Sequence, residues 1–106
     1  MSAKHDFAPL FAHYPSLIAD MPAVFTSHQF ILHLAQRHQP EYIEALHAYR
    51  NTLRDGRPAP FLIVHGILAQ QLQACREMVT QLPGYVDSHD IFGDEAGCTQ
   101  WQKRTG

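Results

Sequence analysis

The longest regular pattern in the chain is an apolar stripe between residues 60 and 82. Its members recur at steps of four and three residues, which predicts a helix of about six turns. The first half is apolar nearly all round, so we expect it to thread the centre of the domain. A short buried strand over 61–64, with a helix starting after Gly66, fits the same residues. The stripe consists of Phe61, His65, Leu68, Leu72, Cys75, Val79 and Leu82.

A second helix start is marked at residues 25 to 30. The Thr26 hydroxyl can cap the helix, and Gln29 stands three residues later, as in a capping box. Phe25 and Phe30 occupy the two positions of a hydrophobic staple. These signals predict a helix that begins directly after Thr26.

Pro40 divides the apolar pattern that follows. The residue before a proline is pushed out of helical geometry, so we expect a break at Gln39 and a new helix from Pro40 to Leu53. One long kinked helix is the alternative. Residues 54–60 concentrate glycine, proline and charge, which predicts a linker.

The two ends of the chain have weaker patterns. Residues 1–24 place apolar side chains at helical steps, but Pro9 and Pro15 interrupt them, so we expect two short helical pieces that form a lid. Pro83 should end the long helix. Residues 85–104 fit either a hairpin or a final helical turn.

Together these patterns predict a mainly α fold in one domain, residues 1–106, with four to five helices. Its parts are an N-terminal helical lid (1–24), a three-helix core (25–82) and an irregular or two-stranded C-terminal tail (83–106). Helices followed by a two-stranded tail have the outline of a winged helix.

Composition supports an ordinary globular chain. Apolar residues make up 45% of the 106 residues and charged residues 17%, and the formal net charge is -2. Cys75 and Cys98 are too few for a disulfide framework, which fits a reducing compartment. No apolar run is long enough to span a bilayer, so we expect a cytoplasmic protein without membrane contact.

Metal and catalytic motifs receive little support. His28, His33 and His38 recur every five residues, which turns their rings to three different faces of a helix. The acidic turn 87–95 matches no calcium loop, and whether it binds a cation stays open. Phosphate-binding and nucleophile motifs are missing, and Cys98 is only a weak nucleophile candidate. We therefore expect no enzyme, no cofactor, no metal site and no small-molecule substrate.

A nucleic-acid-binding domain is the alternative function, because glutamine and arginine can read base edges from a helix. Charge argues against it, since acidic side chains outnumber Lys103 and Arg104 in the tail. The candidate contacts are Arg50, Arg54, Arg57, Gln70, Gln73 and Arg76.

The preferred function is a non-enzymatic protein-interaction or regulatory module that binds a protein partner or a second copy of itself, as a homodimer. The stripe over 61–82 covers about three heptads, the lower limit for a coiled-coil seam, although packing inside the domain explains it better. Phe92 and Trp101 are the candidate partner surface, because large aromatic side chains often anchor interfaces. Closing the core is the other role open to them.

Overall fold

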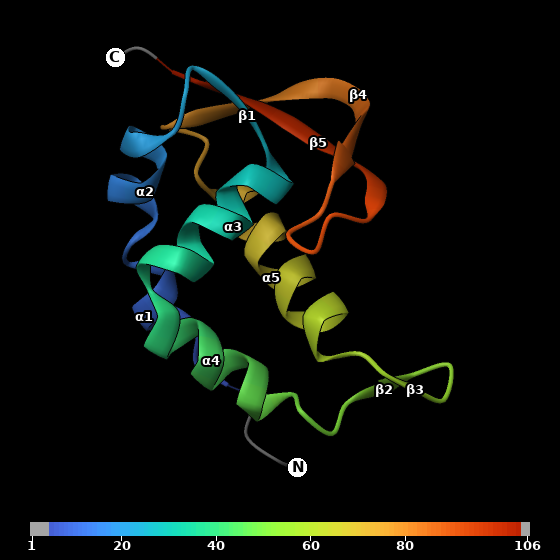
Figure 1. Cartoon of the computed structure of the whole chain (residues 1–106). Coiled ribbons are helices and arrows are strands. Elements are labelled where there is room, and N and C mark those ends of the chain that lie inside the picture. The colour runs from blue at the N-terminus through green and yellow to red at the C-terminus, as the bar shows by residue number, and fades with distance from the viewer. Residues whose placement is uncertain (1–4, 105–106) are drawn as a thin grey trace.

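The computed structural model describes residues 5–104 (Figure 1). Parts of the expected lid and tail, residues 1–4 and 105–106, lie outside this range. The helices are α1 (Ala8–Phe11), α2 (Tyr14–Asp20), α3 (Ser27–Arg37), α4 (Gln39–Ala48) and α5 (Pro60–Ala74). The strands are β1 (Val24–Thr26), β2 (Leu53–Arg54), β3 (Arg57–Pro58), β4 (Val79–His89) and β5 (Glu95–Lys103).

A three-stranded antiparallel sheet closes one side of the helices, with the strand order β1-β5-β4. The C-terminal tail is a hairpin of β4 and β5, which answers the question that the sequence left open. The short strand β1, far away in sequence, pairs with β5 and sets Phe25 opposite Trp101. The beginning and the end of the chain are thus joined through one sheet.

The prediction of a mainly α fold is wrong. The protein is 47% helical and 27% strand, an α+β fold with a three-stranded sheet and a separate two-stranded one. Residues 25–82 do contain α3, α4 and α5, but also the end of β1, all of β2 and β3, and the start of β4. A three-residue strand such as β1 depends on pairing with residues more than 70 positions away, and no local pattern carries that information.

The helix expected over 60–82 ends at Ala74. Its last apolar positions, Val79 and Leu82, belong to β4 instead. Val79 is buried all the same, because the chain turns after Cys75 and brings it back onto the core. The apolar spacing therefore continues from α5 into β4, and spacing alone could not reveal that the helix ends and a strand begins.

Pro83 lies within β4 and does not end it. The pairing of β4 with β5 is irregular between Gln81 and Tyr85, at a bulge that contains Pro83 and Gly84. Proline lacks the N–H that a regular ladder needs, and Gly84 has φ +76°, in the left-handed region that glycine favours. The bulge interrupts the regular ladder, and this interruption lets β4 contain both Pro83 and Gly84.

The linker expected over 54–60 contains a small hairpin. Arg54 and Arg57 pair across Asp55 and Gly56, which have φ values of +53° and +77°. An Asp-Gly pair with positive φ at both positions is favoured in two-residue hairpin turns. The Asp55-Gly56 pair therefore predicts a two-residue hairpin turn, although the glycine, proline and charge content of the segment as a whole indicates only a linker.

The capping box at the start of α3 is present. The Thr26 hydroxyl accepts from the Gln29 backbone N–H (3.1 Å), and the Gln29 side chain accepts from the Thr26 backbone N–H (2.8 Å). Helix α3 ends at Arg37 and α4 starts at Gln39, so the chain breaks one residue before the expected position.

The N-terminal helices are part of the core. Pro9 and Pro15 each stand in the first turn of a short helix, where the missing N–H is tolerated. The Tyr14 ring is buried, and its hydroxyl donates to the Leu68 carbonyl of α5 at 2.6 Å. Burial raises the pKa of Tyr14, so the hydroxyl keeps its proton. No helix within residues 5–104 has the length and apolar character needed to cross a bilayer.

Candidate functional site

A groove of about 530 Å³ runs between α5 and the β4–β5 hairpin, closed at one side by the start of α3. In Figure 1 the turn between β4 and β5 folds back toward α5. A second hollow, lined by the β2–β3 hairpin and the start of α5, shares Phe61 and Leu62 with this groove. The two hollows therefore form one continuous surface along the first half of α5.

Large apolar side chains are exposed along this surface. Tyr85 is 80% exposed, Leu62 55% and Phe92 54%, and Phe61 is also exposed. The rings of Phe61 and Phe92 meet edge to face with centroids 4.6 Å apart, which ties α5 to the hairpin turn. Scattered exposed apolar residues are normal, but a contiguous set lining a groove is typical of an interaction site.

Gly66 lies in the same groove, in the middle of α5. A Cβ atom built there would meet nothing within 4 Å. Glycine inside a helix costs about 1 kcal/mol relative to alanine, and here no contact within the described chain requires it. The position is suited to close approach by another backbone. We call Phe61, Leu62, Gly66, Tyr85 and Phe92 the groove surface.

A partly buried polar pair, Tyr42 and His65, adjoins the groove, and His65 is one of the residues that line it. The Tyr42 hydroxyl and His65 Nε2 share a hydrogen bond of 2.6 Å. Burial lowers the pKa of His65 and raises the pKa of Tyr42 to about 12, so both side chains are neutral near pH 7. His65 also stacks against Phe92 at an interplanar angle of 18°. The groove wall at this point is consequently uncharged.

The hairpin turn is held by its own carboxylate. Asp90 Oδ1 accepts the backbone N–H groups of Phe92 (2.9 Å) and Asp94 (3.0 Å). Partial burial opposes ionisation, but these two hydrogen bonds outweigh it and lower the pKa of Asp90. Gly93, at φ +86°, closes the turn. This network fixes Phe92 at the edge of the groove.

Charge is distributed unevenly along the surface. Helix α5 contains no lysine, arginine, aspartate or glutamate. At its N-terminal end the β2–β3 hairpin carries Arg54, Asp55 and Arg57, a net charge of +1, while the β4–β5 turn carries Asp90, Asp94 and Glu95. Both charged groups adjoin the first turns of α5, because Phe92 of the β4–β5 turn contacts Phe61 and the β2–β3 hairpin lines a hollow with Phe61 and Leu62.

The structure separates the two residues expected to form a partner surface. Phe92 lies in the groove surface. Trp101 is only 2% exposed, and its indole N–H donates to the buried Ser27 hydroxyl at 2.9 Å. Trp101 therefore closes the core, the other role that the sequence had left to it, and offers no surface to a partner.

The candidate nucleic-acid contacts do not form one surface. Arg54 and Arg57 adjoin the start of α5, and Arg50 donates to the carbonyl of His47 at the end of α4. Helix α5 is about 21 Å long at 1.5 Å per residue. At its far end a separate hollow is lined by Gln70, Gln73 and Arg76.

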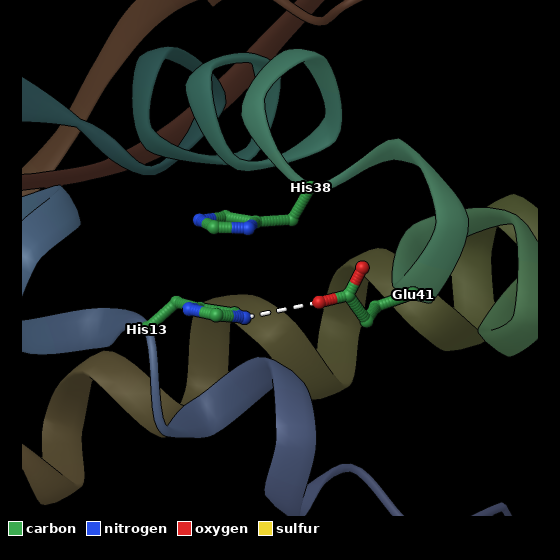
Figure 2. A group of neighbouring side chains, drawn as sticks. All are labelled: His13, His38 and Glu41. Atoms are coloured by element: carbon green, nitrogen blue, oxygen red, sulfur yellow. Dashed lines mark hydrogen bonds and ion pairs between the residues drawn. The ribbon is translucent and has the colours of Figure 1, made fainter.

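One cluster of possible metal ligands joins two helix junctions (Figure 2). His13 precedes α2, His38 lies between α3 and α4, and Glu41 is in the first turn of α4. Their nearest nitrogen and oxygen atoms all lie within 4.8 Å of one another. Spacing along a single helix could not reveal this group, because His13 and His38 lie at different helix junctions.

Cys98 lines the groove together with His28 and His65. Its thiol belongs to a side chain that is buried in β5, and His28 Nδ1 is buried without a hydrogen-bond partner among residues 5–104. The expectation that the chain is not an enzyme stays a prediction.

Most of the groove surface was not predicted from the sequence, since Phe92 is its only member among the expected partner-surface residues. The first half of the helix expected over 60–82 was predicted to thread the centre of the domain, yet only Val64 and Leu68 there are fully buried, while Phe61 and Leu62 are exposed. Gly66 within an otherwise apolar helix could have indicated an exposed groove at this position. The sequence alone does not say which segments pack against the helix.

Comparison with known proteins found no matching family model, curated protein or solved structure.

Proposed function

We propose that this chain is a protein-interaction module that pairs with a second copy of itself through the groove surface. The observation that carries the proposal is the contiguous exposure of Phe61, Leu62, Tyr85 and Phe92 beside Gly66. Aromatic side chains in such hollows supply most of the binding energy in many interfaces. A twofold interface requires one patch to be complementary to itself.

Charge makes this surface self-complementary. In the proposed twofold arrangement, Arg54 and Arg57 of one copy lie against Asp94 and Glu95 of the other, and the reverse contact forms at the same time. Asp55 lies between the two arginines, so the β2–β3 hairpin keeps one net positive charge for this contact. The uncharged face of α5 lies between these contacts. Two copies of α5 can approach closely at Gly66, where no side chain intervenes.

Sedimentation at several protein concentrations tests the pairing. We expect the wild-type chain to shift from monomer to dimer as concentration rises. Phe92→Ser should weaken the dimer by about 900-fold, because each of the two copies loses roughly 2 kcal/mol at an anchoring aromatic residue. Ile43→Ser is the matched control, since Ile43 is 60% exposed on α4 and does not line either hollow. A wild-type mass that stays monomeric at every concentration contradicts the proposal.

A second variant separates loss of pairing from loss of folding. Gly66→Gln introduces a better helix former where a Cβ has free space, so its melting temperature should not fall. Its side chain fills the groove, and we expect a folded monomer. If Gly66→Gln pairs as well as the wild type, the groove surface is not the interface.

Charge exchange tests the orientation. A chain with Arg54→Glu and Arg57→Glu should pair poorly with itself, as should a chain with Asp94→Arg and Glu95→Arg. Mixed together, the two chains should form a heterodimer, because every contact is then between opposite charges. Absence of the heterodimer would reject the twofold arrangement.

The nucleic-acid alternative gains less from the structure. Its candidate residues are divided between the two ends of α5, and the β4–β5 turn is acidic where phosphate contacts need lysine or arginine. We therefore keep the protein-interaction module as the proposed function.

A further inference from the structure

A polar cluster outside the groove combines two imidazoles with a carboxylate. The rings of His13 and His38 stack with centroids 3.6 Å apart and an interplanar angle of 9°. Glu41 Oε2 accepts from His13 Nε2 at 3.0 Å. Figure 2 shows the carboxylate beside the edge of the stacked pair.

The environment keeps the cluster available to an ion. The side chains of His13 and Glu41 are each about one-third exposed, so solvent reaches the edge of the site. A neutral imidazole and an ionised carboxylate are the forms that bind metal.

The ligand types match a zinc-like ion. Two histidines and one glutamate are a known ligand set for zinc, with a fourth position left for water. Four ligands at 2.0–2.1 Å around a tetrahedral ion lie about 3.3 Å apart. The ligand atoms here are within 4.8 Å of one another, so they are near enough to close on one ion once the rings turn.

Binding requires the rings to turn. The lone pair of an imidazole nitrogen lies in the ring plane, and the planes of His13 and His38 are nearly parallel. Both rings must rotate about their Cβ–Cγ bonds before the lone pairs meet at one ion. His13 then binds as its other neutral tautomer: Nε2 gives up its proton to solvent, Nδ1 takes one up, and the metal occupies the place of the Nε2 proton beside Glu41.

We propose that His13, His38 and Glu41 form a three-ligand site for a divalent transition metal of the zinc type. The ion fastens the α1–α2 junction to the α3–α4 junction, two parts of the fold whose ligands His13 and His38 are 25 residues apart in sequence. This site is separate from the groove surface and does not depend on the proposed pairing.

Titration of the tag-free chain, first dialysed against a chelator, tests the site. Calorimetry with zinc should show one equivalent bound, and cobalt in its place should give the visible absorption of a tetrahedral ion. His38→Gln and Glu41→Gln should each weaken zinc binding by about 100-fold or more, since even residues that only support a ligand are worth 10- to 100-fold.

His47→Gln is the matched control, because His47 is an exposed histidine of α4 outside the cluster. It should bind zinc as the wild type does. Melting curves without metal show whether each variant is folded. Absence of zinc binding by the wild type overturns the proposal, as does equal binding by folded His38→Gln, which would indicate only adventitious sites among the other histidines.

Discussion

The hydrogen bond between Trp101 and Ser27 gives the most direct test of how the fold is joined. Both residues are buried, and the bond of 2.9 Å links β5 to the first residue of α3. Ser27→Ala removes the acceptor and leaves the indole N–H buried without a partner. Such a loss costs about 1–3 kcal/mol. Alanine has a slightly higher helix propensity than serine, which offsets a small part of this loss. We therefore expect Ser27→Ala to lower the free energy of unfolding by about 2 kcal/mol.

The assay is urea unfolding followed by tryptophan fluorescence, since Trp101 is the single tryptophan of the chain. The midpoint should fall while the slope of the free energy against urea stays the same. In thermal unfolding, 2 kcal/mol corresponds to a drop of roughly 10 °C for a domain of this size. Ser16→Ala, on the exposed side of α2, is the control and should change stability by less than about 0.5 kcal/mol.

A double-mutant cycle with Trp101→Phe isolates the bond from the change in packing. We expect a coupling energy of about 1 kcal/mol between the two sites. If Ser27→Ala is as mild as Ser16→Ala, or if the cycle gives no coupling, the Trp101–Ser27 bond does not stabilise the junction and the reasoning fails.

Four further outcomes are expected. Tyr14→Phe should lower the free energy of unfolding by about 1 kcal/mol in urea, because the Leu68 carbonyl loses a buried donor. Thr26→Ala should lower it by about 0.5–2 kcal/mol through loss of the capping box, whereas Thr26→Ser should retain most of the stability. Burial lowers the pKa of His65, so the folded state resists protonation of this ring. The free energy of unfolding should therefore be highest above the unfolded pKa of about 6.5 and decrease as the pH drops below it. His65→Gln should reduce this decrease when the free energy of unfolding is measured between pH 7 and 5. Fluorescence anisotropy with duplex DNA should show no salt-dependent binding, and strong binding at low salt would favour the nucleic-acid alternative.

Local signals in the sequence predicted local structure well. The capping box of Thr26 and Gln29 marked the start of α3, because the side chain and the N–H that it caps are only three residues apart. Pro40 likewise marked the break between α3 and α4 to within one residue. Each of these features depends on neighbours along the chain, which the sequence displays directly.

The candidate site was less accessible to sequence reasoning. Phe92 was identified as a large aromatic residue in an irregular segment, but its neighbours Phe61 and Gly66 belong to a helix that was expected to be buried. His13 and His38 are 25 positions apart, so their stacking was not visible from spacing within one helix. The local sequence around two residues does not indicate that they will be in contact when the residues are far apart along the chain.

The sequence by itself determined where most helices begin and that the chain has a core, since caps, prolines and apolar periodicity act over a few residues. Only the tertiary structure decided that β1 pairs with β5, that Trp101 is buried while Phe92 is exposed, and that the stripe beyond Ala74 becomes a strand. Strand pairing and burial depend on which distant segments supply hydrogen bonds and cover apolar surface, and that is settled when the whole chain packs.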